Sequence, residues 1–242
     1  FSDAFTLQTP VADTQIDMGT EQQASDEIKK IALEFGAGLV GITNYDNRWE
    51  YSRKFSDMSA TSRPAEIPDT LNNVIVIAQP MDYELVRTVP SALSGSATGL
   101  GYSHDALTVL SLTQYIRNLG YEAIGSMNDT SLAIPYAIKA GLGEYGRHGL
   151  LITPKYGPRI RLGKVYTNMP LAHDRPISFG VKEFCEICRR CTKGCPVKAI
   201  PDGPPSKDTY NQSNIRGVSK WSVDGEKCFG FWAAQNTDCS IC

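Results

Sequence analysis

Residues 185–196 read CEICRRCTKGCP, a stretch that places four cysteines within twelve residues and ends in proline. The spacing C-x2-C-x2-C-x3-C-P is formed by Cys185, Cys188, Cys191 and Cys195. In two-cluster iron–sulfur proteins with this spacing, the first three thiolates bind one cluster and the fourth binds the other cluster. The spacing therefore indicates an iron–sulfur site.

Two other uses of clustered cysteines fit this stretch less well. A zinc site more often shows two separated C-x2-C pairs. A disulfide framework does not need three cysteines so close together that the local geometry opposes their pairing. Zinc and disulfides therefore stay as minor alternatives to the iron–sulfur interpretation.

All seven cysteines of this 242-residue chain lie in its C-terminal part. If Cys195 binds a second cluster, that cluster needs three more thiolates, and the cysteines that remain are Cys228, Cys239 and Cys242. The same rule takes the fourth thiolate of the first cluster from a cysteine about four residues beyond the last one. We therefore expect a ferredoxin-like module with two 4Fe-4S clusters over residues 180–242. We also expect the chain to be a fragment cut inside the second motif; a natural C-terminus with an incomplete cluster is the alternative.

The cysteine-free part, residues 1–179, alternates between helical and strand patterns. Helical periodicity predicts helices over residues 24–36, 103–120 and 134–143. A short β-branched run predicts a buried strand over residues 73–81, alternating character predicts one over 159–171, and further strands are expected over 37–45 and 121–126. This interleaving predicts an α/β or α+β sheet core rather than a helical bundle.

Local signals also predict where these elements begin and end. Ser25 and Ser103 are the expected N-caps of the first two helices, and Gly36 and Gly120 are expected to end them. We expect an irregular polar insertion near residues 46–70. Residues 201–208, PDGPPSKD, are predicted to form a surface loop.

Charge and hydropathy exclude some classes of partner. The 24 basic and 26 acidic residues form no long run of one sign, so the chain lacks the electrostatic pattern of a nucleic-acid or anionic-membrane binder. No run approaches the roughly 18 apolar residues that span a bilayer. The chain begins FSDAFTLQTP, without Met and without a signal-peptide pattern, so we expect a processed or cut N-terminus.

Residues 134–171, IPYAIKAGLGEYGRHGLLITPKYGPRIRLGKVYTNMPL, are followed by FCEICRRCTKGCPVKAI and then by KCFGFW and DCSIC. In this combination they resemble the reductive dehalogenases, the corrinoid and iron–sulfur enzymes of organohalide respiration. The resemblance runs from about Asn72 to Cys242. It implies an α+β protein with a nitroreductase-like core that holds base-off cobalamin, followed by two 4Fe-4S clusters. The implied activity is an oxidoreductase reaction that replaces a carbon-bound halogen by hydrogen.

The resemblance also implies three catalytic residues. Tyr102 in GYSHDAL matches the tyrosine regarded as the proton donor of the family, Asn128 in SMNDT matches the neighbouring asparagine, and Arg161 in PRIRL matches the arginine. A phenol with a pKa near 10 can supply a proton at neutral pH, and a guanidinium stabilises the phenolate that remains. Asn128 can orient the phenol or the substrate. The plainer interpretations are a half-buried surface tyrosine, a turn asparagine and an exposed strand arginine.

Corrinoid contacts are expected in the segment GLGEYGRH. The expected residues are Gly141, Gly143, Tyr145, Gly146, Arg147 and His148. The glycines either let the backbone approach the corrinoid or simply end a helix. His148 is not expected to bind cobalt, because the D-x-H-x-x-G motif is absent, and a surface or core histidine is the expected state.

The resemblance further implies partners and a location. Two other functions compete with the dehalogenase interpretation. The implied partners are a small organohalide substrate, a membrane anchor protein and an upstream electron donor; no nucleic acid is expected. The implied location is the outer face of the cytoplasmic membrane, although this chain has no twin-arginine export signal. Epoxyqueuosine reductase is the first alternative, but that family has lysine and asparagine where this chain has Arg147 and His148. A non-catalytic electron-transfer protein, with iron and sulfide but no corrinoid, is the second.

Overall fold

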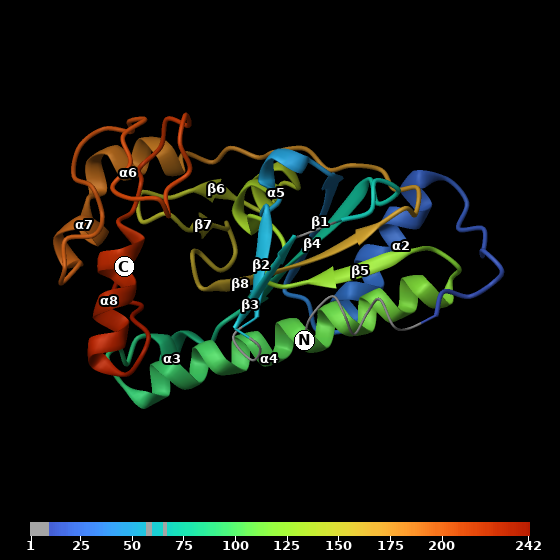
Figure 1. Ribbon diagram of the computed structural model, residues 1–242, viewed down its shortest axis with the longest axis horizontal. Coiled ribbons are helices and arrows are strands. Elements are labelled where there is room, and N and C mark those ends of the chain that lie inside the picture. The colour runs from blue at the N-terminus through green and yellow to red at the C-terminus, as the bar shows by residue number, and fades with distance from the viewer. Residues whose placement is uncertain (1–9, 57–59, 65–66) are drawn as a thin grey trace. The chain divides into compact units, whose positions relative to one another are not determined.

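The computed structural model describes residues 10–56, 60–64 and 67–242 (Figure 1). Its contacts divide the chain into two compact units. The sheet unit consists of Phe1–Pro80, Tyr102–Leu142 and Ile160–Ile177. The cysteine unit consists of Met81–Gly101, Gly143–Arg159 and Ser178–Cys242. The sequence analysis places residues 81–101 and 143–159 in the first domain, whereas in the structure these segments group with the cysteines.

Four antiparallel strands form the central sheet of the sheet unit. Their order is β1 (Leu39–Asn44), β4 (Asn73–Pro80), β8 (Ile160–Thr167) and β5 (Ala123–Ser126). Each strand lies within a segment predicted to be a strand. The expected core, a sheet with interleaved helices, is therefore confirmed. Because every neighbouring pair is antiparallel, the sheet unit is α+β rather than a parallel α/β fold.

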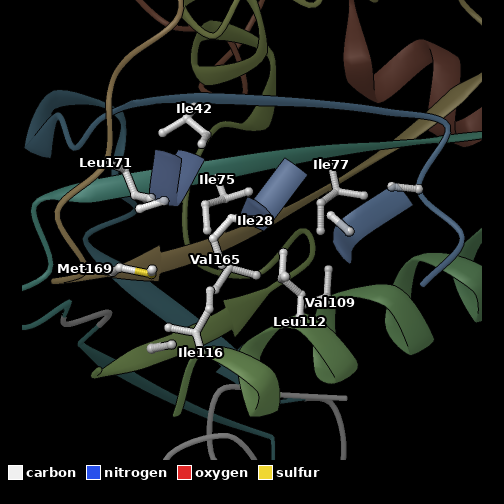
Figure 2. Packing of buried hydrophobic residues seen from close by; sticks show 14 residues of the cluster. Ile28, Ile42, Ile75, Ile77, Val109, Leu112, Ile116, Val165, Met169 and Leu171 are labelled. Atoms are coloured by element: carbon white, nitrogen blue, oxygen red, sulfur yellow. The ribbon is translucent and has the colours of Figure 1, made fainter. Parts of the chain in front are cut away.

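One face of this sheet is covered by α2 (Glu21–Glu34) and by the C-terminal part of α4 (Ala92–Asn118). Figure 2 shows Ile28 of α2 and Leu112 of α4 packed against Ile75 and Val165 of the sheet. All four side chains are fully buried. Apolar residues three or four apart lie on one side of a helix, which gives both helices a continuous apolar face for the sheet.

The opposite face carries α5 (Ala133–Lys139) and a group of aromatic side chains. Tyr136 of α5 makes edge-to-face contacts with Trp49, at 4.8 Å between ring centroids, and with Tyr166 of β8, at 6.2 Å. Trp49 belongs to the short helix η1 (Asn47–Trp49). Both faces of β8 are therefore covered, and this coverage buries the polar residues of the strand.

Helix α5 ends at a glycine, as one of the two interpretations of Gly141 predicts. Gly141 has φ +74° and its N–H donates to the carbonyl of Ile138, while Leu142 N–H donates to the carbonyl of Ala137. These two bonds form a Schellman motif, which requires the left-handed conformation that glycine adopts without strain. A Cβ at this position would also lie 2.6 Å from the carbonyl oxygen of Arg175.

The predicted N-cap of α2 is wrong. The cap is Thr20, which forms a capping box with Gln23. Ser25 lies inside the helix, where its buried hydroxyl accepts a hydrogen bond from Ala172 N–H at 2.8 Å. The predicted cap of α4 is also wrong, because this helix begins at Ala92 and Ser103 lies within it.

The glycine-rich first part of α4 has weak helix propensity, and packing inside the cysteine unit explains why it is helical. A Cβ at Gly95 would lie 3.3 Å from Oγ1 of Thr237 and 3.4 Å from Oδ1 of Asp238. The Thr98 hydroxyl donates a hydrogen bond to the same Asp238 carboxylate. Small residues therefore let the C-terminal segment lie close to this helix.

The insertion near residues 46–70 is less irregular than predicted. It contains η1 and an antiparallel hairpin of β2 (Arg53–Ser56) and β3 (Thr61–Pro64). Residues 57–59 and 65–66 lie outside the described part of the chain. Residues 201–208 form the predicted loop, with only an isolated bridge from Ser206 to Lys220.

The cysteine unit is built from short elements. They are α3 (Tyr83–Val86), the hairpin β6 (Glu144–Tyr145) and β7 (Leu151–Ile152), α6 (Val181–Cys188), α7 (Arg190–Gly194) and α8 (Gly225–Gln235). The Glu144 carboxylate accepts hydrogen bonds from the N–H groups of Phe179 and Val181, so it satisfies the N-terminus of α6. In the part of the chain that the structure describes, no helix is both long enough and apolar enough to cross a bilayer.

Candidate functional site

The three predicted catalytic residues meet at one oxygen atom in the sheet unit. Tyr102 lies on α4, Arg161 lies on β8, and Asn128 follows β5. The Tyr102 hydroxyl accepts a hydrogen bond from Asn128 Nδ2 at 2.8 Å and another from an Arg161 guanidinium nitrogen at 3.3 Å. The guanidinium carbon of Arg161 lies 4.4 Å from the centroid of the Tyr102 ring. The structure therefore brings together residues that the sequence separates by 26 and 59 positions.

This geometry defines what the phenol can do chemically. Both N–H donors occupy acceptor positions of the Tyr102 oxygen, so the hydroxyl hydrogen is not used in either bond. One donor is cationic, and charge-assisted hydrogen bonds stabilise a phenolate more than neutral ones do. Asn128 is exposed and Tyr102 is half-buried, which leaves the phenol accessible to a ligand.

Gly163 allows α4 to lie close to β8 beside this group. A Cβ at Gly163 would lie 2.4 Å from Oδ1 of Asp105 and 2.5 Å from Cγ2 of Val109, both on α4. Arg161 and Gly163 are two residues apart on one strand and so share a face of the sheet. A side chain at Gly163 would therefore push α4, and Tyr102 with it, away from Arg161.

Asp105 is a buried acid that the sequence analysis missed. It is 1 % exposed, and its Oδ1 has no hydrogen-bond partner among the described residues. Burial raises the pKa of this carboxyl to about 7, against the opposing effect of the Lys164 and Arg161 charges. Arg161 Nε is likewise buried without a partner in the described chain. The available sequence signal is the spacing of three residues between Tyr102 and Asp105, which places them on one side of a helix.

Lys164 is a second buried charge that the sequence analysis missed. Its Nζ donates to the carbonyl oxygens of Met127, at 2.5 Å, and Ser131, at 3.3 Å. These carbonyls flank the loop that carries Asn128. The side chain is fully buried, and burial lowers the pKa of its amine to about 8. A lysine inside the apolar strand segment RLGKVYT is the sequence signal for this residue.

The second predicted cluster site forms one pocket in the cysteine unit. Its lining includes the four predicted ligands Cys195, Cys228, Cys239 and Cys242. Most other lining residues are apolar or aromatic, among them Val197, Ile200, Val223, Phe231 and Trp232. All seven cysteines of the chain are free thiols. The pocket thus gathers the four thiols that the sequence spacing assigns to one cluster.

Two of these thiols, Cys228 and Cys242, resist ionisation when no cation is bound. Burial raises the pKa of Cys228, and raises that of Cys242 to about 11, with further contributions from neighbouring cysteines. A coordinated cation reverses this effect, because a thiol that binds a metal is deprotonated. Among the described residues, no three His, Cys, Asp or Glu side chains lie close enough together to hold a single metal ion.

The first predicted cluster site lies where α6 meets α7. Cys185 and Cys188 belong to α6 and Cys191 belongs to α7, and Arg189 between the helices has φ +51°. The left-handed residue turns the chain sharply between the two helices that carry these cysteines. Burial raises the pKa of Cys191.

Arg147 holds the backbone around this corner. It is 2 % exposed, and its guanidinium donates to the carbonyl oxygens of Cys185, Pro201 and Gly203 at 3.0, 2.9 and 2.8 Å. It also stacks on the Trp221 ring, with the guanidinium carbon 4.6 Å from the ring centroid.

The other residues of GLGEYGRH make contacts inside the cysteine unit. A Cβ at Gly143 would lie 2.2 Å from the carbonyl oxygen of Ile152, so this glycine permits the pairing of β6 and β7. The Tyr145 hydroxyl donates to the carbonyl of Trp221 at 3.0 Å. Gly146 leaves room for the ring of His148, whose pKa burial lowers to about 4. The corrinoid contacts of this segment stay a prediction.

The aromatic residues of α8 differ in their exposure. Phe231 and Trp232 line the cysteine pocket, but Phe229 is 68 % exposed. Because α8 turns by 100° per residue, side chains at adjacent positions cannot all face one pocket.

Comparisons with known proteins agree on one family. Residues 59–171 match the family model described as the reductive dehalogenase subunit. The tetrachloroethene reductive dehalogenase of Desulfitobacterium hafniense is 37% identical to this chain, over 92% of the chain and 47% of that protein. A solved reductive dehalogenase, described as suggesting a mechanism for B12-dependent dehalogenation, superposes with a TM-score of 0.85 at 25% identity, over 98% of this chain and 34% of the solved one.

The epoxyqueuosine reductases, the alternative family, match a smaller part of this chain. The epoxyqueuosine reductase of Lactococcus garvieae is 38% identical over 31% of this chain and 21% of that protein. The chain spans about half the length of the tetrachloroethene reductive dehalogenases that it matches.

Proposed function

This chain belongs to the reductive dehalogenase family, and on that premise we propose that the complete protein replaces a carbon-bound halogen of a small organohalide by hydrogen. The observation that carries the proposal is the convergence of Asn128 and Arg161 on the phenol oxygen of Tyr102. The reaction consumes two electrons and one proton and releases halide. The chain must therefore supply an electron path and a proton donor.

Tyr102 is the proposed proton donor. Its hydroxyl hydrogen is directed to neither Asn128 nor Arg161, so it can pass to the carbon that loses the halide. The two N–H donors then stabilise the phenolate, and the stacked guanidinium holds the ring in place. Lys164 positions Asn128 through the carbonyls on either side of it.

The proposed cofactors are one base-off cobalamin and two 4Fe-4S clusters. When bound, they supply a strongly reducing cobalt centre and the electrons that reach it. The accessible Tyr102 hydroxyl suits a ligand bound against the sheet unit, which we propose has a nitroreductase-like core. Corrinoid contacts at Gly141, Gly143 and Gly146 would come from the backbone, because the side chains of Tyr145, Arg147 and His148 contact other parts of the cysteine unit.

The cysteine unit is the proposed ferredoxin-like module. Cys195, Cys228, Cys239 and Cys242 would hold one cluster, and Cys185, Cys188 and Cys191 would contribute to the other. Four free thiols around one largely apolar pocket suit an iron–sulfur cluster, which needs thiolate ligands and exclusion of water. A membrane anchor protein, an upstream electron donor and a site on the outer face of the cytoplasmic membrane complete the proposal.

The test uses the complete protein, reconstituted without oxygen with iron, sulfide and cobalamin. Halide release from chlorinated ethenes, ethanes and phenols is measured with a strong chemical reductant. We expect Tyr102→Phe to abolish halide release and to leave the iron and cobalt contents unchanged. Tyr115→Phe on the same helix is the matched control and should keep normal turnover. Undiminished halide release from Tyr102→Phe would remove this tyrosine from the mechanism.

The metal contents separate the alternatives. Iron and sulfide without cobalt would favour a non-catalytic electron-transfer protein. Reduction of epoxyqueuosine in a tRNA stem loop, with no halide release from any organohalide, would favour the other enzyme.

A further inference from the structure

Trp232 presents a buried N–H group that lacks a well-formed hydrogen bond among the described residues. Its Nε1 is buried and makes no hydrogen bond of good geometry within the described part of the chain, although the Cys228 thiol lies near it. The Trp232 side chain lines the cysteine pocket, and it lies four residues after Cys228 on α8, so the two side chains are neighbours on one side of the helix. An indole nitrogen can only donate, and a buried donor without an acceptor costs free energy.

His148 also lines this pocket, and its ring carries a second N–H group. Its Nδ1 accepts a hydrogen bond from the backbone N–H of Leu150 at 3.1 Å. A backbone nitrogen can only donate, so Nδ1 carries no hydrogen and the ring hydrogen lies on Nε2. The ring lines the pocket beside Cys195 and Cys228. Gly146 is needed for this placement, because a Cβ there would lie 2.7 Å from Cε1 of His148.

The pocket offers these donors only one class of acceptor. Its other lining residues are the four cysteines and apolar or aromatic side chains such as Val197, Val223 and Phe231. One thiol already accepts a backbone hydrogen bond, from Ala199 N–H to Cys195 Sγ at 3.3 Å. Sulfur is therefore the acceptor type that the pocket supplies.

We propose that Trp232 Nε1–H and His148 Nε2–H donate hydrogen bonds to sulfur atoms of the iron–sulfur cluster held by Cys195, Cys228, Cys239 and Cys242, and that these bonds raise its reduction potential. The inference rests on the proposed function, because it requires the cluster. Reduction adds one negative charge to the cluster, and an N–H donor stabilises the more negative form. The cluster sulfurs would thus provide acceptors for both N–H groups, of which the Trp232 group is buried.

Arg147, the residue before His148, makes a different kind of contact. Its donors bind the carbonyl oxygens of Cys185, Pro201 and Gly203, which are backbone atoms and not sulfurs. Adjacent residues of one segment therefore differ in position: Arg147 supports the backbone of the first cysteine group, and His148 lines the pocket of the second.

The test is an anaerobic redox titration of the complete reconstituted protein, followed by electron paramagnetic resonance. We expect Trp232→Phe and His148→Phe each to lower the midpoint potential of one cluster and to leave the other unchanged. Each substitution should change the ratio of reduced to oxidised cluster at a fixed potential by about tenfold. This corresponds to a shift of about 59 mV in the midpoint potential of a one-electron couple. The double variant should shift the same cluster further.

Trp221→Phe is the matched control. Trp221 is a buried tryptophan of the same unit, but its Nε1 already donates to the carbonyl of Gly203 at 3.0 Å. Its loss should leave the potential of the cluster at Cys228 unchanged. A merely structural effect of removing an indole would instead move this potential in both tryptophan variants, and that result would overturn the proposal.

A second measurement uses the protein without substitutions, so it tests the proposal even if the variants fail to fold. Electron–nuclear double resonance of the reduced protein in H2O and D2O should reveal exchangeable protons coupled to the cluster, and 15N-labelled histidine and tryptophan should give nitrogen couplings. Full iron content with unchanged potentials, or without such couplings, overturns this inference and leaves the proposed function standing. A protein that binds no iron overturns both.

Discussion

The polar group around Tyr102 and the pocket around Cys228 differ in how their buried donors and acceptors are paired. In the sheet unit, the phenol oxygen has two N–H donors and Lys164 has two carbonyl acceptors, all from the chain itself. In the cysteine pocket, burial raises the pKa of Cys228 and Cys242, and the Trp232 donor makes no hydrogen bond of good geometry within the described chain. The first site is largely preorganised by protein contacts, whereas the second needs a cationic, sulfur-rich group for its polar atoms to be satisfied.

This contrast predicts that iron removal unfolds one unit and not the other. Structural metal sites contribute about 10 kcal/mol to folding, and the cysteine unit has only short elements around its thiols. We expect α6, α7 and α8 to exchange their amide hydrogens rapidly in the iron-free protein, while β4 and β8 keep their protection. Hydrogen exchange followed by mass spectrometry, with and without reconstitution, measures this difference.

The sheet unit provides the internal reference for that experiment. Its core, with Ile28, Ile75 and Leu112, contains no cysteine and should not respond to iron. Equally slow exchange of α8 in the iron-free and reconstituted proteins would show that the cysteine pocket is preorganised as well, and the contrast between the two sites would disappear.

Asp105 is the exception within the preorganised site, because its charged form is poorly compensated. Its pKa is about 7 in the folded protein and 3.8 in the unfolded chain, so the folded state holds the extra proton between these values. Protonated Asp105 therefore makes its full contribution to the free energy of unfolding below about pH 4. That contribution, up to about 4 kcal/mol, is lost as the pH rises to about 7. Asp105→Asn should remove this slope, and urea denaturation at several pH values between 4.5 and 8 measures it.

The matched control for Asp105 is Asp26→Asn. Asp26 lies on the exposed side of α2, so this variant should keep the pH slope of the unaltered protein. A slope that is the same in the Asp105→Asn variant would show that another group carries the proton. The buried carboxylate of Asp105 would then be compensated by its surroundings, and the difference between the Tyr102 site and the cysteine pocket would be larger than proposed.

The sequence predicts the two sites to different extents, and the physical reason is the range of the contacts involved. Cys195 is distant in the chain from Cys228, Cys239 and Cys242, but the C-x2-C-x2-C-x3-C-P spacing sends its thiolate to the other cluster, and the remaining cysteines then complete the set that shares the pocket. The trio of Tyr102, Asn128 and Arg161 comes from three separate elements, and only the family resemblance connects it. Asp105 and Lys164 were missed because their burial results from contacts on both faces of β8, which the pattern of one strand cannot report.

The fold shows the same division. All four sheet strands lie in segments predicted as strands, and the prediction for β4 rests on a β-branched run between turn residues, which has few other placements. The first turns of α4 were missed because glycines lower helix propensity, and packing against Thr237 and Asp238 outweighs that preference. Tertiary contacts therefore decide the elements that local propensity leaves ambiguous.

The smallest predicted effect tests whether Lys164 preorganises the site through Asn128. Lys164→Met leaves the carbonyls of Met127 and Ser131 without their donor, so the unfolding free energy should fall by about 1–3 kcal/mol. Looser placement of Asn128 should lower turnover by about tenfold, which corresponds to about 1.4 kcal/mol of transition-state stabilisation. Halide release and urea denaturation measure the two effects separately.

A double-mutant cycle then separates positioning from general destabilisation. If Lys164 acts on the reaction through Asn128, the variant that combines Lys164→Met with Asn128→Ala should turn over as slowly as Asn128→Ala alone. Lys30→Met, on the exposed side of α2, is the control and should change turnover neither alone nor in combination. Additive losses from Lys164→Met and Asn128→Ala would mean that the lysine supports the phenol by another route, through its charge beside Asp105 rather than through the loop.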